Sequence, residues 1–399
     1  MKALLLENIH PEGVRLLAER GIEVQLVKGA LDESDLIAAL PGVELLGIRS
    51  KTNVSRAVLD SAPDLMAIGA FCIGTNQIDL ASATEHGTAV FNAPFSNTRS
   101  VVELALAEII SLARHLTDKN ARMHAGAWDK SAKGAHEVRG RTLGIVGYGN
   151  IGSQLSVVAE ALGMRVVFYD TTEKLALGNA RACASLGELL AEADTVTLHV
   201  DGRDGNAGMF GAAQFAAMRP RSLFLNLSRG FVVDYAALRR QVETGHIAGA
   251  AVDVFPSEPK SKGEPFDSEL RGLRNVILTP HVAGSTAEAQ QDIGRFTAGK
   301  LREYAAAGTT TLSVNLPTVT MDLRPGACRV AHLHHNVPGA MARVNQLLAE
   351  HLVNIEGQLL STRGSVGYAL TDVAGPLPTG FLDALAAVPE TISTRVVSS

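Results

Sequence analysis

Three side chains suited to acid–base and anion chemistry follow short apolar runs in the second half of the sequence. Arg229, Glu258 and His281 each lie two or three residues beyond the end of such a run. In an open parallel α/β sheet, ligands bind outside the carboxyl ends of the strands. If the runs are neighbouring strands, we expect the three side chains to converge at one edge of the sheet.

The chemistry of these side chains suits the oxidation of a hydroxyl group next to a carboxylate. His281 can take the hydroxyl proton, because imidazole titrates near neutrality. Glu258 would accept a hydrogen bond from the other imidazole nitrogen and so favour the imidazolium. The planar guanidinium of Arg229 is suited to bind a substrate carboxylate. Each could instead be a surface cation, a loop acid or a packed histidine, but their joint placement favours catalysis.

A glycine-rich loop follows the apolar run 143–146 and opens a helical pattern. Gly147, Gly149 and Gly152 fit the G-x-G-x-x-G pattern of a dinucleotide site, in which glycines allow a tight turn, close approach to the pyrophosphate and close helix packing. Asp170 ends the next run at about the offset of a ribose-binding acid, and its charge would repel the extra phosphate of NADP. The pattern therefore predicts NAD.

Other residues beside the glycine loop or the strand ends are expected to complete the cofactor site. They are Asn150, Ile151, His199, Val200, Ser228, Asp253 and Gly284, together with Arg229 and His281. We expect no metal, because Cys72, Cys183 and Cys328 are far apart and form no C-x-x-C pair.

Two series of alternating strand and helix patterns must position these residues. The second series, from Thr142 to about Pro280, has six apolar runs and predicts a doubly wound Rossmann sheet. A long amphipathic pattern from Ser100 to Gly126 predicts one helix between the lobes, with Ser100 and Glu103 as its capping box.

The C-terminal stretch has a β-α-β-β-α-β order, which is the ferredoxin-like plan. Its predicted strands are 329–334, 354–360, 366–373 and 392–397, and its predicted helices are 338–351 and 380–387. We therefore expect three domains: a substrate-binding domain from 1–97 plus 284–325, an NAD-binding domain at 98–283 and a regulatory domain at 326–399.

Length and composition agree with several globular domains. The chain has 399 residues, more than one core usually supports, with 46% hydrophobic residues, 19% charged residues and a net charge of −5. We expect no nucleic-acid or membrane partner, because no charged tract and no apolar stretch of signal or spanning length occurs. The few, scattered cysteines fit a cytoplasmic protein.

Four motifs together resemble the D-isomer-specific 2-hydroxyacid dehydrogenases: Gly-Tyr-Gly-Asn-Ile-Gly at 147–152, Asn-Leu-Ser-Arg-Gly at 226–230, Asp-Val-Phe-Pro-Ser-Glu-Pro at 253–259 and Thr-Pro-His at 279–281. The resemblance implies that Arg229, Glu258 and His281 are catalytic. It also implies a discontinuous, flavodoxin-like substrate domain completed by a returning helix at about 288–307.

Within this family, the segments 49–52, 71–76 and 91–100 resemble the three-domain bacterial phosphoglycerate dehydrogenases. This implies NAD-dependent oxidation of D-3-phosphoglycerate, a phosphorylated hydroxy acid, to 3-phosphohydroxypyruvate in L-serine biosynthesis, with 2-oxoglutarate as a further substrate. The substrate-binding residues would be Arg49, Ser50, Lys51, Ile73, Gly74 and Asn97. Without the resemblance, Arg49 and Lys51 are equally well explained as a solvated pair. Lys51 replaces a common family arginine, and Asp201 replaces a usual proline.

The same bacterial form has a C-terminal ACT domain, and the segments 334–339 and 353–355 resemble its serine-binding edges. The resemblance implies that His334, Asn336 and Asn354 bind L-serine across a pair of these domains, with feedback inhibition and a homotetramer. Judged on the residues alone, the two asparagines would be helix caps.

Two other functions fit the same motifs. One is a dehydrogenase of a related acid, such as 2-hydroxyglutarate or glycerate. The other is a catalytically silent NAD-binding regulator, which the presence of all three catalytic candidates disfavours.

Overall fold

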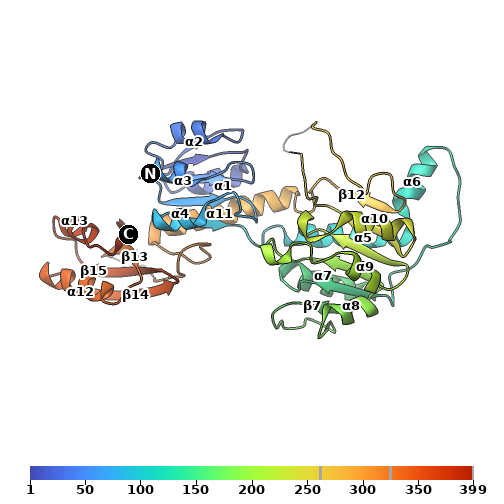
Figure 1. Cartoon of the computed structure of the whole chain (residues 1–399). Helices are drawn as coiled ribbons and strands as arrows, with labels where there is room; N and C mark the ends of the chain where they lie inside the picture. Colours follow the sequence, from blue (N-terminus) through green and yellow to red (C-terminus); the bar gives the residue numbers. More distant parts are fainter. Residues whose placement is uncertain (260–262, 323–325, 398–399) are drawn as a thin grey trace. The chain divides into compact units, whose positions relative to one another are not determined.

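The computed structural model describes residues 1–259, 263–322 and 326–397. It divides into two compact units, Met1–Ser96 with Gln290–Ser399 and Asn97–Ala289 (Figure 1). None of the helices among the described residues is long and apolar enough to cross a membrane. None of the three cysteines, all of which lie in the described ranges, forms a disulfide.

The N-terminal part of the first unit is a parallel five-stranded sheet with helices on its faces. Its strand order, β2-β1-β3-β4-β5, is the flavodoxin-like order that the sequence predicts. The strands are β1 Lys2–Leu5, β2 Glu23–Leu26, β3 Leu45–Ile48, β4 Ala67–Ala70 and β5 Ala89–Asn92, and the helices are α1 Pro11–Ala18, α2 Glu33–Ala39, α3 Arg56–Asp60, α4 Leu80–Glu85 and α11 Ala287–Ala307. Buried strands such as β3 and β4 are continuously apolar, as expected when helices cover both faces.

The second unit contains a seven-stranded parallel sheet in the order β12-β11-β10-β9-β6-β7-β8. The strands are β6 Thr142–Val146, β7 Arg165–Tyr169, β8 Arg181–Ala182, β9 Thr195–Leu198, β10 Ser222–Asn226, β11 Ile247–Val252 and β12 Val276–Leu278. The helices are α5 Thr98–Arg114, α6 Leu116–His124, α7 Asn150–Ala161, α8 Leu186–Glu192, α9 Ala212–Ala217 and α10 Tyr235–Glu243, with short 3-10 turns at Asp204–Asn206 and Gly230–Val232. The Rossmann prediction is confirmed, and the strand order reverses between β6 and β9, which is where such sheets bind ligands. The prediction missed β8, whose two exposed residues are too few to show a pattern.

The single helix predicted between Ser100 and Gly126 is wrong. The structure has two helices, α5 and α6, because His115 adopts a left-handed backbone with φ of 51° and interrupts the helical path. The predicted capping box is also wrong, since α5 begins one turn earlier, after Asn97. The Ser100 hydroxyl lies 2.8 Å from the Thr286 hydroxyl instead.

The C-terminal part of the first unit is a four-stranded antiparallel sheet with two helices, in the order β14-β15-β13-β16. Its elements are β13 Ala327–His335, α12 Ala340–Glu350, β14 Ile355–Arg363, β15 Val366–Ala374, α13 Phe381–Ala386 and β16 Thr391–Val397. This order confirms the predicted ferredoxin-like plan. Val344 and Leu348 of α12 are buried against the sheet, as the helical spacing of apolar residues predicts.

A buried ion pair joins this sheet to the end of α11. Arg329 is 0% exposed, and its guanidinium donates to both carboxylate oxygens of Asp372 at 2.6 and 2.8 Å. The same group donates to the carbonyl oxygens of Ala307 and Met321. The structure therefore groups the C-terminal sheet with the first lobe, and the three domain boundaries stay a prediction, with residue 325 outside the described residues.

Candidate active site

The side chains of His281 and Glu258 form a hydrogen-bonded pair beyond the carboxyl ends of β12 and β11. His281 Nδ1 lies 2.8 Å from Glu258 Oε2, and the other carboxylate oxygen accepts from the backbone NH of Phe255 at 3.0 Å. His281 has a left-handed backbone with φ of 54°. Its side chain is 51% exposed, so the second imidazole nitrogen is available to a substrate.

The pair shifts both pKa values toward the charged forms. The hydrogen bond that His281 donates to the Glu258 carboxylate raises the pKa of His281 above its ordinary value, against the opposing effect of burial. Burial acts to raise the pKa of Glu258, but the hydrogen bonds from His281 and from Phe255 lower it overall. The arrangement therefore stabilises an imidazolium, the form that follows proton uptake.

Arg229 is placed by a hydrogen-bonded turn at the end of β10. The Asn226 side chain is 0% exposed, donates to the Arg229 carbonyl and accepts from both the backbone NH and the hydroxyl of Ser228. A Cβ atom at Gly230 would lie 2.0 Å from the carbonyl carbon of Phe255. Only glycine therefore lets the Arg229 turn pack against the chain that leads to Glu258.

Asp253 holds the loop that carries His281. Its carboxylate is 0% exposed and accepts from the Thr279 hydroxyl at 2.6 Å and from the backbone NH groups of Val282 and Ala283 at 2.8 and 2.9 Å. These bonds fix the backbone on both sides of His281. The sequence placed Asp253 among the cofactor contacts, and its buried contacts indicate a positioning role.

Glu108 is a buried acid behind this loop that the sequence analysis did not assign. Its residue is 3% exposed, and neither carboxylate oxygen has a hydrogen-bond partner among the described residues. Burial, with a further contribution from the Asp253 charge, raises the pKa of Glu108 to about 8. Glu108 is therefore protonated at neutral pH.

We expect Glu108→Gln to flatten the dependence of stability on pH. Because folding raises this pKa from 4.5 to about 8, the stability linked to Glu108 is fully present below pH 4.5 and is lost as pH rises toward 8. The loss is roughly 4 to 5 kcal/mol, at about 1.4 kcal/mol per pKa unit. Urea unfolding from pH 5 to 9 would measure it, with the exposed Glu103→Gln on the same helix as control. Parallel curves for wild type and Glu108→Gln would contradict the buried ionisation.

The glycine loop has the geometry of a dinucleotide site. Gly147 has a φ of 91°, and a Cβ atom there would lie 2.6 Å from the carbonyl oxygen of His199, which follows β9. A Cβ at Gly152 would lie 2.3 Å from the Gly147 carbonyl oxygen, whereas one at Gly149 would meet nothing within 4 Å. The open space beside Gly149, at the start of α7, fits a pyrophosphate.

The remaining predicted cofactor residues surround this loop. The Asp170 carboxylate accepts from the Tyr148 and Thr172 NH groups, and these bonds lower its pKa although burial acts to raise it. Asn150 and Ile151 begin α7, and His199 and Val200 follow β9. Burial lowers the pKa of His199 to about 4. Asp201, which stands where the family usually has proline, forms an ion pair with Arg203.

In the first unit, the loop with Arg49, Ser50 and Lys51 follows β3 and is held by Glu7. The Glu7 carboxylate accepts from the backbone NH groups of Arg49, Lys51 and Thr52 at 2.9 to 3.1 Å. No carboxylate among the described residues pairs with either cationic side chain. The two charges are therefore available to an anion.

The structure brings the second predicted substrate loop, with Ile73 and Gly74, next to this one. The Gln77 side chain donates to the Arg49 carbonyl at 2.6 Å and to the Gly74 carbonyl at 3.4 Å. The Asn92 side chain donates to the Ile73 carbonyl at 2.6 Å. Asn97 belongs to the second unit, where a Cβ at Gly284 would lie 2.2 Å from its Nδ2.

The three predicted serine-binding residues lie in the C-terminal sheet, but they do not meet within one chain. His334 and Asn336 lie at the β13 end that pairs with Gly367 and Ser365, whereas Asn354 lies beside Ala374 at the other end of β15. Gly367 and Ala374 are seven positions apart along β15, which corresponds to roughly 23 Å. Neither asparagine caps α12, whose N-cap is Gly339 and C-cap His351, so the capping interpretation is wrong.

His334 has an unsatisfied nitrogen beneath this edge. Its residue is 2% exposed, Nδ1 lies 2.8 Å from the His335 carbonyl, and Nε2 has no partner among the described residues. A Cβ at Gly367 would lie 2.4 Å from the ring, so glycine makes room for it.

No sequence pattern pointed to the buried polar residues around these loops. Glu7, Gln77, Asn226 and Tyr235 hold the loops by hydrogen bonds, whereas Glu108 is buried without a partner among the described residues. The sequence signal that could have found Glu108 is an acid on the otherwise apolar face of α5. Asn226 stood inside a motif without a role.

Two family models match the chain. Residues 106–283 match the NAD-binding domain of the D-isomer specific 2-hydroxyacid dehydrogenases, and residues 330–393 match an ACT domain like that of the AHAS small subunit. In the described part of the chain, no cluster of three or more His, Cys, Asp or Glu side chains could hold a metal ion.

Curated relatives match along the full chain. A D-3-phosphoglycerate dehydrogenase from Haemophilus influenzae is 46% identical over 100% of this chain and 97% of its own length. One from Escherichia coli is 44% identical with the same coverage. A crystal structure of D-lactate dehydrogenase from Aquifex aeolicus with NAD and lactic acid is 26% identical, covers 76% of this chain and 95% of its own, and has a TM-score of 0.65.

Proposed function

Because this chain belongs to the D-3-phosphoglycerate dehydrogenase family, and so is an NAD-dependent oxidoreductase, we propose that it oxidises D-3-phosphoglycerate to 3-phosphohydroxypyruvate in L-serine biosynthesis. The observation that carries the proposal is the His281–Glu258 pair, 2.8 Å apart, beyond the ends of neighbouring strands. The intact pair argues against a silent NAD-binding regulator.

In this mechanism, His281 takes the proton of the substrate hydroxyl through its free imidazole nitrogen. Glu258 stabilises the resulting imidazolium, and Arg229 binds the substrate carboxylate. The glycine loop and Asp170 would hold NAD, which would supply the hydride acceptor. In the reverse direction the imidazolium returns the proton to the carbonyl oxygen, so the raised pKa of His281 favours reduction near neutrality.

We assign the substrate phosphate to the loop with Arg49 and Lys51. Glu7 fixes the loop backbone without neutralising the two side chains. Arg49 can donate two parallel hydrogen bonds to a phosphate, and Lys51 supplies a point charge. 2-Oxoglutarate, which carries a second carboxylate in place of the phosphate, is a further substrate that this loop could accept.

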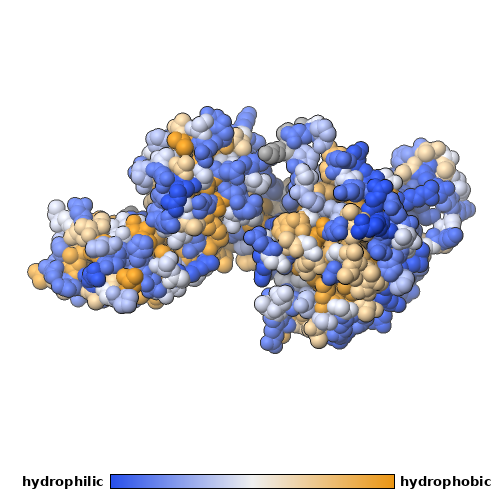
Figure 2. Space-filling model, viewed as in Figure 1, coloured by the Kyte–Doolittle hydropathy of each residue, from blue (hydrophilic) through white to orange (hydrophobic). Residues whose placement is uncertain are grey.

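We propose that L-serine binds at His334, Asn336 and Asn354 and inhibits the enzyme. Because these residues lie at opposite ends of one sheet, a site that uses all three needs two copies of the chain. Hydrophobic areas interrupt the hydrophilic surface of the C-terminal sheet (Figure 2), and Leu359 and Leu360 of β14 are exposed.

Further apolar surface supports the proposal that the enzyme is a homotetramer. Trp128 is 73% exposed, and Leu116 and Met123 of α6 are also exposed. These three side chains lie on a segment separate from the C-terminal sheet, so each chain offers two distinct apolar surfaces. Two separate self-complementary contacts are what a tetramer with dihedral symmetry needs.

Turnover of NADH with 3-phosphohydroxypyruvate, 2-oxoglutarate and hydroxypyruvate, each with and without L-serine, tests the proposal. We expect the phosphorylated substrate to have the highest kcat/KM and serine to suppress its turnover. Asn336→Ala and Asn354→Ala should each raise the half-inhibitory serine concentration at least about tenfold with kcat unchanged, because each removes hydrogen bonds to the zwitterion. Asn345→Ala, an exposed change on α12, is the control.

The other outcomes are equally informative. A preference for an unphosphorylated acid would contradict the role of Arg49 and Lys51. Equal serine sensitivity in all three asparagine variants would place the effector elsewhere.

A further inference from the structure

A small pocket opens at the amino ends of the strands in the second unit, the edge opposite to Gly147 and His281. Arg141, Asp194, Arg221 and Asn275 each directly precede a strand, β6, β9, β10 and β12 respectively, and line this pocket. The pocket thus lies on the edge of the sheet that the dehydrogenase chemistry does not use.

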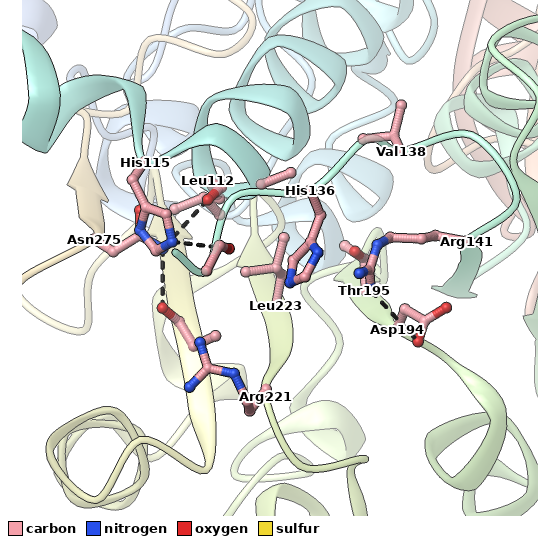
Figure 3. A pocket seen from close by; sticks show the side chains of 13 residues that line it. Leu112, His115, His136, Val138, Arg141, Asp194, Thr195, Arg221, Leu223 and Asn275 are labelled. Atoms are coloured by element: carbon pink, nitrogen blue, oxygen red, sulfur yellow. Dashed lines mark hydrogen bonds and ion pairs between the residues drawn. The ribbon is translucent and has the colours of Figure 1, made fainter. Parts of the chain in front are cut away.

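Four basic side chains surround the pocket (Figure 3). His115 lies between α5 and α6, His136 lies on the loop that returns to β6, and Arg141 and Arg221 lie at the strand starts. The single acid in the lining, Asp194, is already engaged by the Thr142 NH and by Arg219 at 2.9 Å. The lining therefore has an excess of positive charge.

The donors of these basic groups are largely uncommitted. Within the described residues, the Arg221 guanidinium and the His136 imidazole make no hydrogen bond, and Arg141 only approaches Asp194 at 3.8 Å. His115 Nε2 lies 3.1 Å from the Gly134 carbonyl oxygen, so Nδ1 is the ring nitrogen that can still bind another group. Arginine carries several donors and stays charged, so Arg141 and Arg221 can bind an oxyanion in place of water.

We propose that this pocket binds a small oxyanion of the phosphate class, either inorganic phosphate or the phosphoryl group of a small metabolite. The cavity of about 20 Å³ has room for one or two water-sized atoms, so it excludes a nucleotide or a sugar and would take one or two oxygens of an oxyanion. Guanidinium and imidazole donors match its oxygens.

The bound anion would connect two parts of the chain. His115 and His136 belong to the arm formed by α6 and its return loop, whereas Arg141 and Arg221 belong to the sheet edge (Figure 1). The anion thus fastens the arm, including Lys130 and Lys133, to the sheet. The site is a structural or regulatory one, separate from the catalytic pair.

Equilibrium dialysis of the full chain with labelled inorganic phosphate tests the proposal, with saturating NADH present to fill the dinucleotide site. We expect Arg221→Asn to bind one phosphate per chain fewer than wild type. Asparagine tolerates the left-handed backbone of Arg221, whose φ is 64°. Arg239→Gln removes the same charge from an exposed position on α10 and should leave the stoichiometry unchanged.

Further variants and measurements keep the test decisive. His136→Asn should weaken phosphate binding about tenfold, and it replaces Arg221→Asn if that variant does not fold. Phosphate should also slow tryptic cleavage after Lys130 and Lys133 in wild type only. If β-glycerophosphate displaces labelled phosphate at a lower concentration than unlabelled phosphate does, the ligand is a phosphoryl metabolite. If unlabelled phosphate is the better competitor, the ligand is the free ion.

The pH dependence gives an independent check with sulfate, whose charge stays constant. Burial, together with the positive charges of Arg141, Arg221 and His115, lowers the pKa of His136, and only Asp194 opposes this. An anion would favour the protonated imidazole, so sulfate should bind more tightly at pH 6 than at pH 8. The proposal would be overturned if wild type, Arg221→Asn and His136→Asn bound phosphate equally. It would also be overturned if Arg239→Gln lost as much phosphate binding as Arg221→Asn.

Discussion

His281→Asn is expected to lower kcat with 3-phosphohydroxypyruvate by about 10²- to 10⁴-fold, the range for loss of a general acid–base group. Asparagine preserves the left-handed backbone at this position, where φ is 54°. The Asp253 bonds to Thr279, Val282 and Ala283 involve none of the His281 side chain. The loop should therefore keep its shape while the proton donor is lost.

Steady-state kinetics with a parallel measurement of NADH binding by fluorescence would separate chemistry from folding. We expect NADH still to bind, because the glycine loop is intact, with the affinity lowered only by any contact that the His281 side chain itself makes to the cofactor. His124→Asn, at the exposed end of α6, is the matched control and should keep full activity. A loss below about tenfold in His281→Asn would remove this residue from the acid–base role.

Glu258→Gln is expected to reduce kcat/KM by about 10- to 100-fold and to move the pH profile. The hydrogen bond from Glu258 is the largest cause of the raised pKa of His281, so its loss lowers that pKa. Reduction of the keto acid needs the imidazolium and declines as pH rises through this pKa. In the variant the decline should therefore begin at a lower pH.

The measurement is kcat/KM for keto-acid reduction from pH 5 to 9 in wild type and in Glu258→Gln. An acid residue that only supports the fold would lower activity equally at every pH. A shift of the alkaline limb to lower pH identifies the carboxylate as the partner that sets the charge of His281. A profile with an unmoved limb would assign Glu258 a purely structural role.

The three-part architecture could be predicted because local sequence patterns repeat in order. Continuous apolar runs at 143–146 and 166–169 mark buried parallel strands, and the glycine spacing at Gly147 marks where the first of them meets a helix. The α5–α6 break could not be predicted in the same way. The interruption depends on one backbone conformation at His115, a residue with no strong preference for it.

By itself, the sequence determined the Rossmann and ferredoxin-like plans and NAD as the cofactor, and it predicted Arg229, Glu258 and His281 as catalytic residues, because these depend on short-range periodicity and motif spacing. Only the tertiary structure decided which groups meet. It gave the predicted contact of His281 with Glu258 its distance of 2.8 Å, and it alone set the burial of Glu108 behind Asp253 and the separation of Asn336 from Asn354. These features depend on contacts between residues far apart in the chain, which strand order and register fix and local patterns do not encode.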